Sequence, residues 1–108
     1  MSYKILLTPS FERELKKLSK KYLSLKGDLS VLLTLLKEDP TTGKSLGNDC
    51  YKIRLAISSK NKGKSGGARV ITYVKIVDEV IYLISIYDKS DTDSISDNEI
   101  LSKMKLYK

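Results

Sequence analysis

The chain has 108 residues, of which 41% are hydrophobic and 31% are charged. This length and composition predict one folded domain over residues 1–108 and exclude an intrinsically disordered chain. Twenty basic residues against 13 acidic ones give a net charge of +7, which favours an acidic partner such as nucleic acid.

Residue types that are rare or absent exclude several classes of protein. The sequence contains no histidine, so a Ser-His-Asp triad and a histidine-ligated zinc are both excluded. Its single cysteine cannot form an internal disulfide, which is typical of the reducing cytoplasm. The opening apolar stretch is too short for a signal peptide, and no apolar run approaches the roughly 18 residues of a membrane span. We therefore expect a cytoplasmic protein with no membrane partner, no metal and no cofactor.

The first predicted elements are a strand and a helix. Residues 3–8 are rich in aliphatic and aromatic types, which predicts the strand. The helix is expected to begin at Pro9, with Thr8 or Ser10 as its cap. Its apolar side chains recur at helical spacing and form one stripe: Phe11, Leu15, Leu18, Tyr22 and Leu25.

A second helix is predicted directly after the first. Gly27 interrupts the pattern, Asp28 is a suitable cap, and Pro40 ends the segment. The buried stripe of this helix is expected to consist of Leu29, Leu32, Leu33 and Leu36. Two antiparallel helices joined at Gly27 are the expected arrangement.

From residue 50 onward the apolar period changes to two, which predicts a strand over 50–57. Residues 58–67 are dominated by glycine and lysine and are predicted to be a loop. Further strands are expected over 68–76 and 79–87, the latter apolar on both faces and therefore interior. A last helix is expected to begin at Asp93 or Ser94 and to end near Lys105.

These elements occur in the order β-α-α-β-β-β-α. Such an order predicts an α+β fold. The two N-terminal helices are expected to pack on one face of a small, mostly antiparallel sheet, and a C-terminal helix completes the domain.

Basic residues are concentrated between positions 52 and 69, where no acidic residue occurs. If the two strands of this region pair, Lys52, Arg54 and Arg69 converge on one sheet face. The loop beside them carries Lys60, Lys62 and Lys64, which are candidates for binding RNA. Such cations repel one another unless an anion lies among them, and phosphate is the simplest anion. The alternative is a solvated strand face whose charges protect a sheet edge.

Other motifs have simpler explanations. Gly43-Lys44-Ser45 and Gly63-Lys64-Ser65 resemble the end of a P-loop but lack its earlier glycine and its strand–helix context. The acidic residues after position 87 lack the spacing of a calcium loop and are expected to cap a helix. Cys50 is expected to be a buried thiol. Tyr73 and Tyr87 are candidates for stacking on RNA bases, although core packing is the alternative for each.

Three segments together form a recognisable pattern: Cys50-Tyr-Lys-Ile-Arg-Leu-Ala, then Gly63-Lys-Ser-Gly-Gly-Ala-Arg-Val-Ile-Thr-Tyr73, then Leu83-Ile-Ser-Ile-Tyr-Asp-Lys89. They resemble the RelE/ParE superfamily of type II toxin–antitoxin toxins, and in particular its HigB-like branch. The element order predicted above is also that of the family, so the resemblance covers essentially the whole chain.

The resemblance implies an endoribonuclease that cuts messenger RNA in the ribosomal A site, by attack of a ribose 2′-OH on the adjacent phosphate. It also implies a cognate antitoxin, the ribosome and messenger RNA as partners. RelE works without histidine, so the absence of histidine here is compatible with this activity.

Four basic residues correspond to the catalytic positions of the family. Lys52 and Arg54 match two strand lysines, and Arg69 matches an arginine that binds the scissile phosphate. Lys89 falls where the family has a further arginine. The family's catalytic tyrosine falls on Ile95, for which Tyr87 is the candidate substitute. The resemblance thus makes Arg69 a phosphate clamp, Arg54 a transition-state cation, and Lys52 or Lys89 a proton-transfer group.

Two other functions remain open at this point. A ParE-type toxin shares the fold but inhibits DNA gyrase, and this inhibition needs no phosphate clamp. A toxin-like protein that binds RNA or ribosomes without cutting RNA would explain the isoleucine at position 95.

Overall fold

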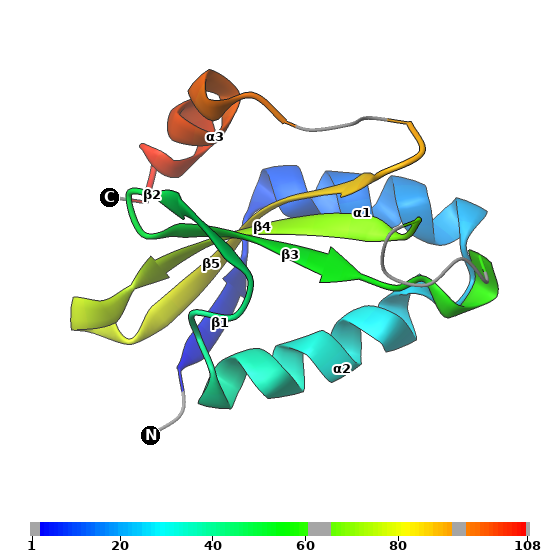
Figure 1. Ribbon diagram of the computed structural model, residues 1–108, viewed down its shortest axis with the longest axis horizontal. Helices are drawn as coiled ribbons and strands as arrows, with labels where there is room; N and C mark the ends of the chain where they lie inside the picture. Colours follow the sequence, from blue (N-terminus) through cyan, green and yellow to red (C-terminus); the bar gives the residue numbers. More distant parts are fainter. Residues whose placement is uncertain (1–2, 61–65, 92–94, 108) are drawn as a thin grey trace.

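The computed structural model describes residues 3–60, 66–91 and 95–107. Its elements are β1 (Lys4–Leu7), α1 (Pro9–Lys21), α2 (Leu25–Glu38), β2 (Lys44–Gly47), β3 (Cys50–Leu55), β4 (Ala68–Lys75), β5 (Val80–Asp88) and α3 (Asp97–Met104). The strands form one sheet in the order β1-β5-β4-β3-β2, in which only β1 and β5 are parallel (Figure 1). The predicted α+β fold, with two N-terminal helices on a mostly antiparallel sheet, is confirmed.

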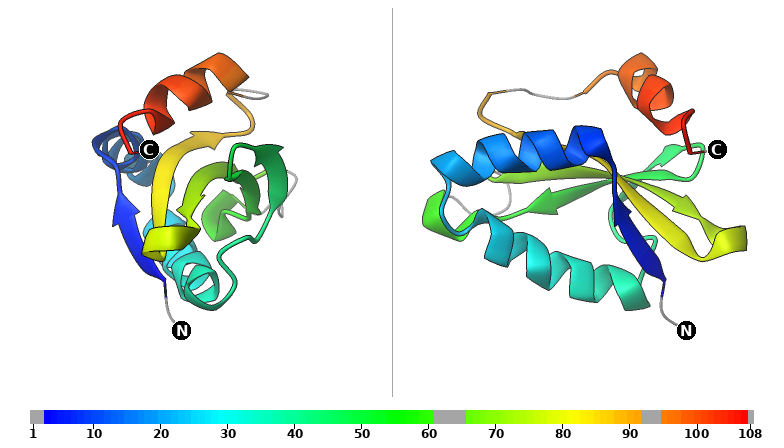
Figure 2. Two further views of the ribbon diagram at one scale, coloured as in Figure 1. Left: turned by 90° about the vertical axis from the view of Figure 1, so that its left-hand side faces the viewer. Right: turned by 180° about the vertical axis from the view of Figure 1, so that it is seen from behind.

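The sheet separates two apolar cores. On one face, α1 and α2 cover the strands with Phe11, Leu25 and Leu36 fully buried (Figure 2). On the other face, α3 packs through Ile100 and Met104 over Ile71 and other strand residues. Because α3 is short, it covers only one end of this second face (Figure 1). The rest of that face is available for a site.

Thr8 starts the first helix and ties it to the sheet. Its Oγ1 accepts a hydrogen bond from Phe11 N at 3.2 Å and donates one to Leu83 O at 2.8 Å. Pro9 occupies the first turn of the helix, where a backbone N–H would have no partner within the helix, so the N–H that proline lacks is not needed there. Of the two caps expected from the sequence, the structure therefore uses Thr8.

The prediction that the helices join at Gly27 was wrong. Helix α1 ends at Lys21, and α2 begins at Leu25, so Gly27 lies within the first turn of α2. Leu25 therefore belongs to the second helix, where its side chain is fully buried. Asp28 is not the cap, since it also lies in that first turn, and it accepts a hydrogen bond from Ser24 instead. Burial of Leu25 outweighs the modest preference of a glycine for a break.

Strand β2 was not among the predicted elements. It pairs antiparallel with β3 through a two-residue loop, Asn48 and Asp49, both of which have positive φ. That loop is typical of a type I′ hairpin turn. The strand itself gives little apolar signal, because Leu46 is its only hydrophobic residue.

Two smaller predictions are confirmed. Strand β5 is interior, since it lies between β1 and β4. Cys50 is buried under α3, with its Sγ 3.3 Å from the Sδ of Met104. In the described part of the chain, no helix is long and apolar enough to cross a membrane.

Candidate active site

A pocket of about 450 Å³ opens on the sheet face that carries α3. It gathers all four residues predicted to be catalytic, from three separate parts of the chain. Its lining consists of Thr42, Gly43, Lys44, Lys52, Ile53, Arg54, Arg69 and Lys89. Among the described residues of this lining, five side chains are cationic and none is acidic, so the pocket is suited to a polyanion.

Strand pairing accounts for this concentration of charge. Arg54 is directly opposite Arg69 in the β3–β4 pair, and Lys44 is directly opposite Lys52 in the β2–β3 pair. Residues opposite one another in antiparallel strands lie on the same face, about 5 Å apart. Like charges in these positions destabilise the sheet unless an anion lies between them. The structure therefore has two cross-strand pairs of cations side by side.

Lys44 is the cation of the described pocket lining that was not predicted from the sequence. It lies in a Gly-Lys-Ser run that resembled a failed P-loop, and its own strand was not predicted. The available signal was the Asn-Asp turn, which would have placed Lys44 opposite Lys52 in a hairpin.

Gly43 allows the chain to approach β3 at the pocket. Its φ is +105°, and a Cβ built there would lie 2.6 Å from Lys52 O. Both the backbone conformation and the close approach require glycine at this position.

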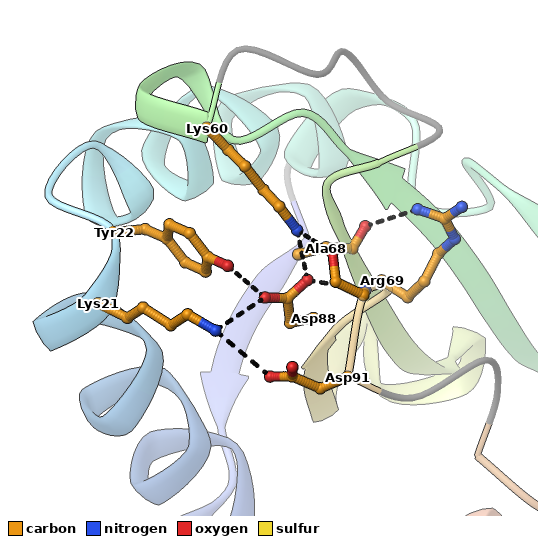
Figure 3. Close-up of polar contacts among 8 residues, drawn as sticks. Lys21, Tyr22, Lys60, Ala68, Arg69, Asp88 and Asp91 are labelled. Carbon is orange, nitrogen blue, oxygen red and sulfur yellow. Dashed lines mark hydrogen bonds and ion pairs between the residues drawn. The ribbon is translucent and has the colours of Figure 1, made fainter.

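Arg69 is the most buried of the pocket cations, with 5% of its surface exposed. Its Nη1 donates a hydrogen bond to Ala68 O at 3.1 Å. Figure 3 shows its guanidinium directed away from Asp88, although the two residues belong to neighbouring strands. A guanidinium presents a rigid fork of donors, so Arg69 is suited to clamp a phosphate.

Asp88 lies at the end of β5 with its side chain fully buried. Its Oδ1 accepts hydrogen bonds from Lys60 Nζ at 2.7 Å and Ser90 N at 2.9 Å, and its Oδ2 accepts one from Tyr22 Oη at 2.5 Å. Lys21 Nζ lies 3.8 Å from Oδ2 (Figure 3). Burial raises the pKa of the Asp88 carboxyl, but the bonds from Lys60, Tyr22 and Ser90 outweigh burial and hold its pKa at about 2.

Lys60 was predicted to bind RNA, but the structure places it with Asp88 and not in the pocket lining. Its side chain is 9% exposed, and its ammonium lies 5.3 Å from the centre of the Tyr22 ring. Burial lowers the pKa of Lys60, but the hydrogen bond to Asp88, the charge of Asp88 and the interactions with Tyr22 together outweigh burial and raise the pKa above its ordinary value. The other two predicted loop cations, Lys62 and Lys64, lie outside the described residues.

The two tyrosines proposed to stack on RNA bases are both buried. Tyr73 lies in the core beneath α3, stacked on Tyr82 with ring centroids 6.0 Å apart. Tyr87 is closer to the site, because it is opposite Arg69 in the β4–β5 pair. Burial raises the pKa of the Tyr87 phenol, and the backbone N–H of Ile95 and the charge of Arg69 partly offset this effect.

The residue expected from the resemblance to replace the family's catalytic tyrosine lies outside the pocket. Ile95 packs against the core beneath α3 and does not line the cationic pocket. Within the described ranges, no group of three or more cysteine or acidic residues is placed to hold a metal ion.

The family is established by sequence. A family model described as the RelE toxin of the RelE/RelB toxin–antitoxin system matches residues 3–108. The chain belongs to the RelE toxin family. The expected RelE/ParE superfamily membership is thereby confirmed, as is the assignment to a toxin–antitoxin system.

Solved RelE structures resemble this chain in fold. A doubly substituted E. coli RelE toxin in the free state has a TM-score of 0.64 at 25% identity, and the match covers 100% of each chain. The toxin–antitoxin complex RelBE of E. coli has a TM-score of 0.63 at 26% identity, covering 81% of this chain and 96% of that one.

A more distant structural neighbour is the RelBE2 toxin–antitoxin complex of Mycobacterium tuberculosis. Its TM-score is 0.61, covering 82% of this chain and 99% of that one, and at 16% identity the likeness is one of fold alone. No curated protein matches the chain by sequence.

Proposed function

We propose that this RelE-family toxin is a ribosome-dependent endoribonuclease of the HigB-like branch that cuts messenger RNA in the A site. The observation that carries the proposal is the pocket in which Arg54 faces Arg69 and Lys44 faces Lys52. Two adjacent pairs of like charges are suited to a phosphodiester that gains negative charge as it reacts. On this proposal the protein acts in the cytoplasm.

The proposed reaction breaks one ester bond and forms another. The 2′-oxygen attacks the neighbouring phosphorus and loses its proton to a base, and the bond from phosphorus to the 5′-oxygen breaks. The 5′-oxygen takes up a proton, leaving a 2′,3′-cyclic phosphate and a 5′-hydroxyl end. Arg69 clamps the phosphate, and Arg54 stabilises the charge that develops in the transition state.

Proton transfer is assigned to the pocket lysines. Guanidinium groups stay protonated at ordinary pH, so neither arginine can act as the base. Lys52 and Lys89 both line the pocket and come from different segments, one from β3 and one from the residues after β5. One of them takes the 2′-OH proton and the other assists the leaving oxygen.

A non-catalytic toxin that blocks ribosomes is the second candidate, and the position of Ile95 favours it. An aliphatic side chain in the core beneath α3 can neither donate nor accept a proton. Such a protein would retain RNA binding through the cationic pocket, with steep salt dependence, and would leave the RNA intact.

An antitoxin is the remaining partner. Its neutralising segment is proposed to cover the cationic pocket, either with acidic residues or by adding a helix or strand. Charge reversal at Lys52, Arg54 and Arg69 is then expected to weaken antitoxin binding. Antitoxin affinity that is indifferent to these reversals would contradict this part of the proposal.

Primer extension on a reporter messenger RNA tests the function. Wild type and Arg69→Ala are induced briefly in a bacterial host, with Arg13→Ala as the control that removes the same charge from the exposed side of α1. We expect codon-phased cuts with wild type and Arg13→Ala, during translation only, and none with Arg69→Ala. Growth arrest without cuts would support ribosome blocking, or gyrase inhibition if cleavage complexes of gyrase accumulate.

A further inference from the structure

We propose that Asp88 is a positioning residue for the cationic pocket: its buried carboxylate holds the end of β5, from which Lys89 reaches the site. This inference rests on the proposed function only in taking the pocket as the place where phosphate reacts. Asp88 itself does not line the pocket.

The carboxylate lies on the opposite face of the sheet from the pocket. Asp88 pairs with Ala68, which is buried in the core under α1 and α2. Two residues that contact Asp88 come from the end of the first helix: Lys21 is the last residue of α1, and Tyr22 follows it. Because successive side chains of a strand alternate between faces, the residues next to Asp88 and Ala68 are directed toward the pocket side. Those residues include Lys89 and Arg69, and both line the pocket.

The partners of Asp88 join three segments that are distant in sequence. Lys60 comes from the turn after β3, Tyr22 follows α1, and Ser90 follows β5. The backbone beside the carboxylate is tied in the same way, since Lys89 N donates to Gly67 O at 3.0 Å and Asp91 N donates to Asp88 O at 3.0 Å. Lys89 is thus held through its own backbone amide and through the carboxylate of Asp88, the residue before it.

A contribution to stability alone would not require a charge at this place. Burying a carboxylate and an ammonium is costly, and a well-packed apolar replacement is often as stable. An ionised Asp88 has a property that an apolar side chain lacks: it accepts several directional hydrogen bonds at once. The geometry that these bonds impose is what an active site needs, because small displacements of catalytic groups reduce rates strongly.

Amide hydrogen exchange tests whether Asp88 holds Lys89. The variants are Asp88→Asn and the milder Tyr22→Phe, and Asp91→Asn is the matched control, since it removes a carboxylate that is 60% exposed. The reporting amide is Lys89 N–H, and the reference is Val74 N–H, which donates to Asp49 O at the other end of β4. We expect exchange at Lys89 to become at least about tenfold faster in both Asp88→Asn and Tyr22→Phe. The Val74 rate and all rates in Asp91→Asn should stay within about twofold of wild type.

Equal exchange at Lys89 in wild type, Asp88→Asn and Tyr22→Phe would overturn the proposal. So would a uniform acceleration at Lys89 and Val74, because it would mean that Asp88 stabilises the whole fold and not the strand end.

A double-mutant cycle then connects the geometry to the reaction. Asp88→Asn is expected to lower the cleavage rate about tenfold in the wild-type and Lys44→Met backgrounds, and less than about twofold in the Lys89→Met background. Equal losses in all three backgrounds would show that Asp88 does not act through Lys89. If wild type cleaves no RNA, the proposed function fails, while the exchange experiment still decides whether Asp88 positions Lys89.

Discussion

Arg54 and Arg69 face each other directly across the β3–β4 pair, at the wall of a pocket that has further cations on either side. Two guanidinium groups in this relationship repel each other, and a phosphate bound between them would offset the repulsion.

Replacing Arg54 by glutamine is expected to stabilise the free protein while abolishing cleavage. Arg54 is exposed, so the substitution removes repulsion from Arg69 without opening the core. The free energy of unfolding in urea at low salt should rise by about 0.5 kcal/mol, which is typical of a cross-strand charge pair. Arg13→Gln is the control and should change neither quantity. A loss of stability in Arg54→Gln would mean that the two arginines are already compensated in the free protein.

Inorganic phosphate is expected to stabilise the protein through the same pocket. A ligand at ten times its dissociation constant adds about 1.4 kcal/mol to the free energy of unfolding. The melting temperature should therefore rise with phosphate at constant ionic strength, and the rise should be absent in Arg69→Ala. An equal rise in both proteins would assign the effect to general ion exclusion and not to the pocket.

Gly43 and Gly27 should respond oppositely to alanine. At Gly43 an added Cβ meets Lys52 O at 2.6 Å, and its φ of +105° is unfavourable for alanine, so Gly43→Ala should lose about 1–3 kcal/mol of stability. At Gly27, in the first turn of α2, a Cβ meets no atom within 4 Å. Gly27→Ala should therefore gain about 0.5 kcal/mol. Urea unfolding measures both, and cleavage should be reduced only in Gly43→Ala.

The Asp88 network predicts a specific loss of stability in acid. Its folded pKa of about 2 lies below the ordinary value of 3.8, so the folded state binds fewer protons than the unfolded state near pH 3. The stabilisation, about 2 kcal/mol, is present above pH 4 and is lost as the pH falls toward 2. Urea unfolding at pH 7, 4, 3 and 2 should show this loss in wild type and Asp91→Asn. The Asp88→Asn protein should have a lower free energy of unfolding at pH 7 and should lose less of it between pH 7 and pH 2. Identical pH dependences in wild type and Asp88→Asn would refute the assignment of the acid loss to Asp88.

Local patterns in the sequence were sufficient for most of the fold. Helical spacing of apolar residues such as Phe11 and Leu18 predicts α1, and alternation from Tyr51 to Leu55 predicts β3. These signals are local because each element buries its own apolar side. The start of α2 was predicted wrongly and β2 was not predicted at all, because the position of each depends on contacts with another element.

The residues of the candidate site also differ in whether local patterns or tertiary contacts decide their positions. The sequence by itself determined that Lys52 and Arg54 share one face of a strand, because side chains alternate with residue number. Arg69 was predicted to join them only if the two strands pair, and the β3–β4 register meets that condition. Only the tertiary structure decided that Lys44 joins them and that Lys60 instead pairs with Asp88, 28 residues away. The physical reason is that a cation takes the strongest anionic partner within reach, and which groups are within reach depends on strand pairing and helix packing.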